Sequence, residues 1–232
     1  MIYFLCKQHY PDIVRVCSET GWHVLSKKGF DYFLDGTKKN IHFGNDIAIR
    51  WGAYFTVPIP TVNSKEAASL AAHKSRSRKI LSEHVPTPKT WYSLKDAEFP
   101  CIGRPSRHSG GEDFVIVEKN VSLPNGWYFS EIIDSKEEYR VYVGYGKILG
   151  AYKKKFKEGE IRANRAITGL QWGSLVSAPT EVEKVALTAL KCINLDFGAV
   201  DILGGKVIEV NTCPTISNKY TRDMLINFIK NL

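Results

Sequence analysis

Short apolar runs separated by polar turns make up the N-terminal part of the chain. The run IYFLC is followed by the segment DIVRVCSE, a helix that Pro11 opens, and then by the runs WHVL and DIAIRW. Proline is favoured in the first turn of a helix, and strands that alternate with helices are typical of a parallel sheet. The pattern therefore predicts a small α/β domain over residues 1–63.

Prolines mark the two turns that follow. The segment VPIPTVN predicts a connector, and Ser64 after it is placed to cap an alanine-rich helix. HVPTPKTW predicts a second turn. We therefore expect a domain boundary near residue 63 and assign residues 64–232 to a second domain.

The second domain is predicted to be mostly sheet. Its apolar runs are rich in β-branched and aromatic residues, as strands are. They read FPCIGRP, FVIVE, WYFSEII, YRVYVGYGKILGAYKKK, AVDIL and KVIEVN. One helix is expected at about 180–193, where apolar residues form a single stripe at the helical spacing typical of packing on a core. They are Val182, Val185, Ala186, Ala189, Leu190 and Ile193.

The composition is that of a folded protein without covalent cross-links. Of the 232 residues 44% are hydrophobic, which is enough to bury a sizeable core. The five cysteines show no C-x-x-C pair and no nearby histidine at metal-ligand spacing, so they indicate neither a disulfide framework nor a zinc site. The opening MIYFLC is too short for a signal peptide or a membrane span. These features predict a cytoplasmic protein that does not enter a membrane.

The chain is basic, with 32 lysines and arginines against 24 aspartates and glutamates and a net charge of +8. This surplus suits nucleic acid, an acidic peptide or a phosphate-bearing substrate, and equally an ordinary solvated surface. The densest basic segments, HKSRSRK and KKKFK, lack the interleaved aromatic residues of a single-strand nucleic-acid platform. Charge alone therefore does not name the partner.

Three oxygen donors are expected to converge in the segment VDILGGKVIEVNTCP. Glu209 and Asn211 are two residues apart on one strand and so emerge on the same face, where Asp201 on the partner strand of a hairpin can meet them. Oxygen-only ligation of this kind suits Mg²⁺. The alternative is a solvated strand face.

A Ser-Gly-Gly loop within RPSRHSGGEDF follows a basic residue at the end of an apolar strand. Glycines let backbone amides approach phosphate oxygens closely. The loop matches neither the Walker pattern nor G-x-G-x-x-G, so an ordinary hairpin loop is the alternative.

A pair of cations, Arg140 and Lys154, flanks the turn GYGK. A hairpin would bring both to one face, where they can neutralise charge during phosphoryl transfer. The alternative is an exposed basic edge that discourages aggregation.

In this order and spacing, the three signals resemble the ATP-grasp superfamily, most closely the ribosomal-protein glutamate ligases and related carboxylate-amine ligases. The resemblance covers residues from about 60 to 218. It implies an ATP-grasp fold of the α/β plus α+β class, in which a small N-terminal α/β domain precedes two lobes that clasp ATP between their sheets.

The resemblance also implies a set of nucleotide contacts. They comprise an early lysine, a basic residue at a strand end, a loop over the phosphates, the adenine-reading linker between the lobes, and a ribose-binding acid. In that order they are Lys74; Arg104; Ser109, Gly110 and Gly111; Glu131, Ile132 and Ile133; and Glu138. Arg104 departs from the family, which has lysine at this position. Arginine keeps the positive charge of lysine but presents it as a planar fork instead of a compact ammonium group.

Further matches concern the reaction centre. GAYKKKFKEGEIRANRAITG resembles the glutamate ligases' G-A-x-K-R, K-E-G and R-S-N stretch, which places Lys154 at the position of their arginine. The implied cofactors are ATP and Mg²⁺, with two ions expected and Mn²⁺ as an alternative. By this match the catalytic residues are Arg140, Lys154 and Arg162, the substrate-binding residues are Arg162 and Asn164, and the metal ligands are Asp201, Glu209 and Asn211.

The activity implied by the resemblance is that of an ATP-dependent carboxylate-amine ligase, which forms an amide through an acyl-phosphate. Its partners would be a carboxylate substrate and an amine acceptor, and the basic residues between 153 and 165 favour an acidic peptide or protein tail. Nucleic acid is not favoured, and oligomerisation is left open. The alternatives are an ATP-grasp kinase that stops at phosphorylation and a non-catalytic module that binds ATP or nucleic acid.

Overall fold

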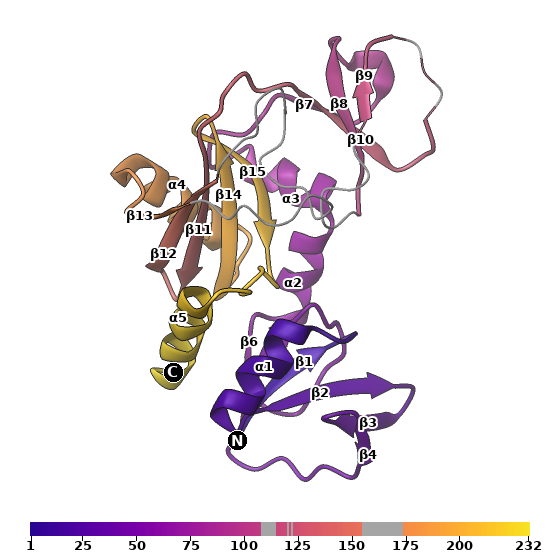
Figure 1. Ribbon diagram of the computed structural model, residues 1–232. Coiled ribbons are helices and arrows are strands. Elements are labelled where there is room, and N and C mark those ends of the chain that lie inside the picture. The colour runs from indigo at the N-terminus through magenta and orange to yellow at the C-terminus, as the bar shows by residue number, and fades with distance from the viewer. Residues whose placement is uncertain (108–114, 120, 122, 155–173) are drawn as a thin grey trace.

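The described residues form three sheets that follow one another along the chain in a computed structural model of the protein, shown in Figure 1. The structure describes residues 1–107, 115–119, 121, 123–154 and 174–232. None of the helices in these ranges has the length and apolar character needed to cross a bilayer.

The N-terminal sheet has six strands in the order β4-β3-β2-β1-β5-β6. It contains β1 (Ile2–Cys6), β2 (His23–Lys28), β3 (Asp31–Leu34), β4 (Thr37–Lys39), β5 (Ile47–Trp51) and β6 (Thr61–Val62), with helix α1 (Pro11–Thr20) after β1. The pairs β1–β2, β1–β5 and β5–β6 are parallel, as predicted, whereas β2, β3 and β4 pair antiparallel. The segment VPIPTVN is more than a connector, because its last residues form β6.

Two short helices lead out of this sheet. Helix α2 (Lys65–Ala72) begins after Ser64, whose side chain accepts a hydrogen bond from the Ala67 amide, so the predicted N-cap is confirmed. Helix α3 (Lys74–Leu81) follows directly. Its first amide, that of Lys74, donates to the Ser106 carbonyl at 2.7 Å and thereby ties α3 to the next sheet.

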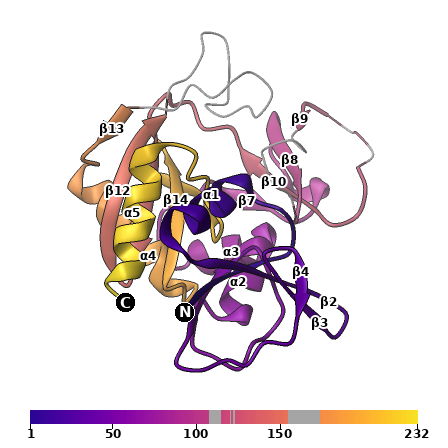
Figure 2. The ribbon, with the colours of Figure 1, turned by 60° about the horizontal axis from the view of Figure 1, so that its bottom comes forward.

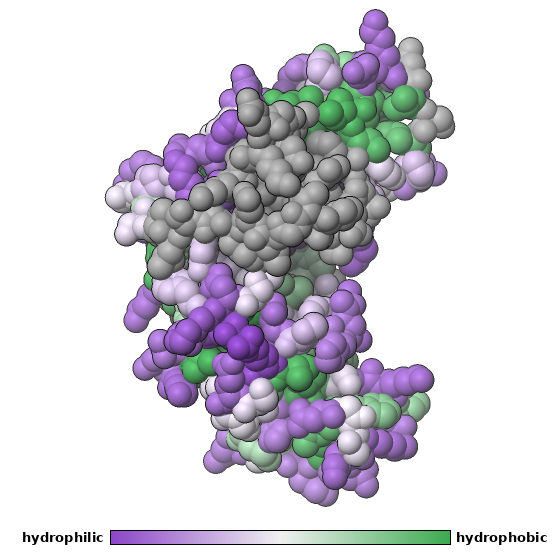
Figure 3. Space-filling view, in the orientation of Figure 1, coloured by the Kyte–Doolittle hydropathy of each residue, from purple (hydrophilic) through white to green (hydrophobic). Residues whose placement is uncertain are grey.

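The second sheet forms a small lobe of four antiparallel strands in the order β7-β10-β8-β9. Its elements are β7 (Thr90–Trp91), the 3-10 turn η1 (Leu94–Asp96), β8 (Cys101–Pro105), β9 (Val115–Val117) and β10 (Trp127–Glu131). Among its described residues, one core cluster buries Trp91, Cys101, Val117 and Phe129. Hydrophobic surface covers part of this lobe in Figure 3, and Ile116 is 44% exposed.

The third sheet forms a large lobe of five antiparallel strands in the order β13-β12-β11-β14-β15. Its elements are β11 (Glu138–Gly144), β12 (Lys147–Lys154), β13 (Ser174–Val176), α4 (Thr180–Cys192), β14 (Phe197–Leu203), β15 (Lys206–Asn211) and α5 (Lys219–Lys230). The predicted core helix is confirmed as α4, which buries Ala186, Ala189 and Leu190. Helix α5 was not predicted, and Figure 2 shows it beside α1, which it contacts.

The N-terminal sheet and the large lobe share a core. The Trp51 ring stacks on Phe197 at 5.9 Å between centroids, and Phe197 stacks on Phe228 at 5.2 Å. Asn63, at a φ of 66°, donates from Nδ2 to the Phe197 carbonyl at 2.8 Å and accepts at Oδ1 from the amides of Asp196 and Phe197 at 2.9 and 3.0 Å. We propose that residues 1–63 and 64–232 are two domains that meet at this junction.

Candidate active site

Charged side chains from neighbouring strands meet on one face of the large-lobe sheet. Arg140 of β11 is directly opposite Asp201 of β14 and donates from Nε and Nη2 to its two carboxylate oxygens at 2.8 and 2.7 Å. Lys154 of β12 is opposite Glu138, forms an ion pair with it and lies 3.1 Å from Asp201. Because side chains two residues apart on a strand share a face, Glu138 and Arg140 project together. All four residues are 8% exposed or less.

Strand β15 extends this face with the other two predicted metal ligands. Glu209 is directly opposite Asp201, and the amide nitrogen of Asn211 lies 3.5 Å from an Asp201 oxygen. The turn before β15 uses Gly204 and Gly205, both at positive φ, which glycine adopts without steric cost. The predicted hairpin is therefore confirmed, and it brings the three oxygen-bearing side chains together.

Lys74 joins the cluster from α3. Its Nζ lies 2.7 Å from Glu209 Oε1 and donates to the Val210 carbonyl at 2.9 Å. The face thus carries three carboxylates and three cations in contact, an arrangement in which each buried charge has a partner. The carboxylates are Glu138, Asp201 and Glu209, and the cations are Lys74, Arg140 and Lys154.

The cluster shifts the acid–base properties of its members. Burial alone would raise the pKa of Asp201, but the charges of Arg140 and Lys154 more than offset burial and hold that pKa well below its ordinary value. Burial raises the pKa of Glu138, with Lys154 opposing the rise and Asp201 adding to it. Asp201 is therefore ionised at neutral pH and available to a cation.

The donor set fits magnesium. Two carboxylates and one amide provide only oxygen ligands, once the Asn211 amide turns its oxygen inward, and Mg²⁺ takes such ligands together with phosphate oxygens and water. In the described ranges no group of three or more His, Cys, Asp or Glu side chains is arranged to hold a metal. A site here would thus depend on the Asn211 amide and on oxygens from a ligand.

The predicted nucleotide contacts that the structure describes come from several elements, among them the small lobe and the segment that joins the two lobes. Arg104 is on β8 of the small lobe, opposite Tyr128 of β10. Glu131 ends β10, accepts from the Lys89 amide at 2.9 Å and pairs with Lys206, the first residue of β15. Residues 132–137, which include Ile132 and Ile133, connect β10 to β11 and so join the lobes. The predicted Ser109, Gly110, Gly111, Arg162 and Asn164 lie outside the described residues.

One buried cation near this junction was not predicted. Arg78 of α3 is 5% exposed, and its Nη2 donates to the Ile208 carbonyl of β15. Its Nη1 is buried and has no hydrogen-bond partner in the part of the chain that the structure describes. The sequence signal that could have identified Arg78 is its position four residues after Lys74, because residues four apart lie on the same face of a helix.

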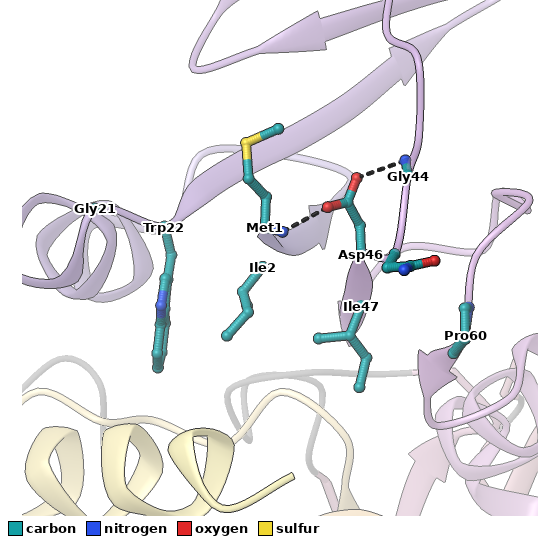
Figure 4. Close-up of a pocket in the computed structure, with 9 residues that line it drawn as sticks. Met1, Ile2, Gly21, Trp22, Gly44, Asp46, Ile47 and Pro60 are labelled. Carbon is teal, nitrogen blue, oxygen red and sulfur yellow. Dashed lines mark hydrogen bonds and ion pairs between the residues drawn. The ribbon is translucent and has the colours of Figure 1, made fainter.

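A separate pocket of about 650 Å³ lies at the amino ends of β1 and β5, as Figure 4 shows. Trp22, Ile47 and Pro60 line it, and Asp46 there binds the Met1 amino group. Ligands of parallel sheets bind at the carboxyl ends of the strands, which is the opposite end. None of the predicted site residues lines this pocket.

Comparison with known proteins identifies the family. A profile of the RimK-like ATP-grasp domain matches residues 127–232. A protein of Pseudoalteromonas translucida named "Probable alpha-L-glutamate ligase" is 32% identical over 254 aligned positions, which cover 95% of this chain and 83% of that protein. The chain belongs to the RimK-like ATP-grasp family. It spans 66% of the length of another relative of that name, from Vibrio vulnificus, to which it is 30% identical over 73% of its own length.

A solved structure supports the family's fold. The ATP-grasp ligase PsnB complexed with minimal precursor, Mg and ADP superposes with a TM-score of 0.65 at 14% identity, over 99% of this chain and 96% of that one. The predicted ATP-grasp fold is thereby confirmed. ATP-grasp ligases use ATP and Mg²⁺, which agrees with the oxygen-only donor set on the large-lobe sheet.

Proposed function

We propose that this RimK-like ATP-grasp protein is an ATP-dependent carboxylate-amine ligase. The observation that carries the proposal is the cluster on the large-lobe sheet, where Asp201 is held by Arg140 and Lys154 directly beside Glu209 and Asn211. Carboxylates and cations on one face can bind a metal ion together with a phosphate chain, because the carboxylates hold the metal and the cations bind the phosphate oxygens.

The chemistry has two steps. An oxygen of the substrate carboxylate attacks the γ-phosphorus of ATP, and the bond from this phosphorus to the β–γ bridging oxygen breaks. The products of this step are an acyl-phosphate and ADP, which departs as the leaving group. The nitrogen of an amine then attacks the acyl carbon, inorganic phosphate leaves with the bonding electron pair, and the nitrogen loses a proton. The products are an amide, ADP and phosphate, and no nucleophile from the protein is required.

Asp201, Glu209 and Asn211 would hold magnesium, for which two ions are proposed and Mn²⁺ is an alternative. When bound, the metal neutralises phosphate charge and orients the transferring group. Arg140 and Lys154 would exchange Asp201 for oxygens of the transferring phosphoryl group and stabilise its charge. The same role is proposed for Arg162, which with Asn164 would also bind the substrate.

The remaining proposed contacts bind the phosphates, the adenine and the ribose of ATP. Lys74 and the small-lobe residue Arg104 would bind phosphates, as would the amides of Ser109, Gly110 and Gly111. The backbone of 131–133 would read adenine, and Glu138 would accept from the ribose hydroxyls.

For the acceptor, we propose an acidic peptide or protein tail. The surplus of lysine and arginine between residues 153 and 165 would attract it. The structure of the ATP-grasp ligase PsnB was solved in complex with its precursor peptide PsnA2 and AMPPNP.

The test measures ADP release from Mg-ATP across a panel of amino acids and acidic, neutral and basic peptides, with mass spectrometry of the products. A mass increase by one amino acid less water, stoichiometric with ADP, is the expected result. ADP release with a stable phosphorylated product would indicate a kinase instead. If the protein binds ATP but shows no turnover with any member of the panel, it would be a non-catalytic ATP-binding module.

A further inference from the structure

The open edge of β15 is covered by two cations from α3. β15 is the last strand of its sheet in the described part of the chain, where its outer carbonyls have no strand partner. The Ile208 carbonyl accepts from Arg78 Nη2, and the Val210 carbonyl accepts from Lys74 Nζ. One helical turn rises about 5.4 Å and two strand residues span about 6.6 Å, so side chains four apart on the helix reach alternate carbonyls.

These two cations differ in how their charge is balanced. Lys74 also contacts the Glu209 carboxylate at 2.7 Å. Arg78 forms no ion pair with any carboxylate in the described ranges, and its buried Nη1 has no acceptor there. Burial lowers the pKa of Arg78, and although Tyr128 opposes this, the positive charge of Arg104 lowers it further. The positive charge of Arg104 thus disfavours a charged Arg78, and the negative charge of Glu209 favours it to a smaller extent.

Arg78 and Arg104 belong to two elements, α3 and β8, that a backbone hydrogen bond links. Arg104 is opposite Tyr128 in the small-lobe sheet, and the Lys74 amide bonds to the carbonyl of Ser106, just past the end of β8. Tyr128 is 3% exposed, and burial raises its pKa, while the charges of Arg78 and Arg104 oppose the rise and that of Glu209 adds to it. The Arg78 guanidinium thus lies on the edge of the large sheet, and Arg104 lies two residues before Ser106, the small-lobe residue that contacts α3.

We propose that Arg78 is a second phosphate-binding guanidinium of the nucleotide site, in which Nη2 holds the β15 edge while Nη1 donates to the phosphate chain beside Arg104. This inference rests on the proposed ATP-dependent function. A buried donor without an acceptor, next to a like charge, is unfavourable, and a polyanion placed there removes both penalties. The arginine fork can serve two acceptors at once, whereas a lysine ammonium acts as a single point charge.

The test compares Arg78→Met and Arg78→Lys with the control Arg76→Met, which removes an exposed arginine of the same helix. Calorimetry measures the affinities for Mg-ATP and for adenosine, which lacks the phosphates. Charged hydrogen bonds are strong enough that Arg78→Met should weaken Mg-ATP binding by about tenfold or more. Adenosine binding should be unchanged, Arg78→Lys should show a smaller loss for Mg-ATP, and Arg76→Met should bind like the wild type.

Equal losses for Mg-ATP and adenosine, or no loss for either, would overturn the inference and leave Arg78 as a cap on the β15 edge. If Arg78→Met does not fold, Arg78→Lys decides: wild-type affinity for Mg-ATP would overturn the proposal. The proposed function fails separately, because a wild type that binds Mg-ATP but forms no amide refutes the ligase reaction and still allows the Arg78 measurement.

Discussion

Arg140 and Asp201 face each other across β11 and β14 and share two hydrogen bonds, at 2.8 and 2.7 Å, in a setting where both are less than a tenth exposed. Asp201 also holds Lys154 at 3.1 Å. A metal that takes over the Asp201 carboxylate would therefore release two cations at the place where phosphate oxygens arrive. The ion pairs of Asp201 with Arg140 and Lys154 therefore join the residues for which we propose roles in metal and phosphate binding.

Substitution of the two carboxylate ligands should separate stability from activity. Asp201→Asn leaves Arg140 and Lys154 buried without their shared partner, which should lower the free energy of unfolding by about 3–5 kcal/mol. The Glu209 side chain is 21% exposed, and Lys74 keeps the Val210 carbonyl, so Glu209→Gln should change stability by about 1 kcal/mol or less. Both variants should lose turnover. Urea unfolding and ADP release check this, and near-normal turnover of Glu209→Gln would exclude Glu209 as a metal ligand.

The Asp201 contribution to stability should depend on pH. Its pKa is lowered on folding, so below the unfolded value of 3.8 the unfolded chain binds a proton that the native protein does not. Stability from this group is therefore present above pH 3.8 and is lost as pH falls through the lower native pKa. The difference in unfolding free energy between wild type and Asp201→Asn should be constant near neutrality and shrink below pH 3.8. Urea titrations across this range measure it, and a difference that stays constant in acid would contradict the prediction.

Arg104 should act as a phosphate contact despite replacing the family's lysine. Arg104→Ala should weaken Mg-ATP binding by about tenfold or more, because a charged hydrogen bond is lost, and Arg104→Lys should retain most of the affinity. Calorimetric titration with Mg-ATP provides the measurement. The matched control is Lys95→Ala, which removes an exposed cation from the same lobe and should bind normally. Unchanged affinity in Arg104→Ala would remove Arg104 from the site.

Asn63 should be a strong determinant of stability. Asn63→Gly keeps access to the φ of 66° but removes the side-chain hydrogen bonds to Asp196 and Phe197 and leaves buried backbone groups unpaired. The expected loss is about 2–4 kcal/mol in the free energy of unfolding, measured by urea denaturation. Asn45→Gly, at an exposed position, should change it little. A loss for Asn63→Gly as small as that of the control would show that the junction does not depend on these bonds.

Much of the candidate site could be predicted because it depends on local geometry. Side chains alternate along a strand, so the sequence places Glu209 with Asn211 and Glu138 with Arg140 on shared faces. The Gly204–Gly205 turn between two apolar runs predicts a hairpin, which brings Asp201 to Glu209. The resemblance to a known family, rather than spacing, supplied the chemical roles.

Other features were decided by tertiary structure alone. Arg140 and Asp201 are 61 residues apart in the chain, and Asn63 and Asp196 are 133 apart, so no local pattern shows their contact. Arg78 lies in a polar, basic helix, and only the docking of α3 on the β15 edge buries it. Helix α5 is likewise positioned by tertiary packing, because its apolar residues share one core cluster with Phe4 of β1 and Ile13 of α1.

The physical reason is the range of the forces involved. Strand alternation, helix caps and glycine turns are set by backbone geometry within a few residues, so the amino-acid sequence by itself determined them. Strand register between distant segments and the burial of a charge depend on the packing of whole layers. Those were settled only when the three sheets came together.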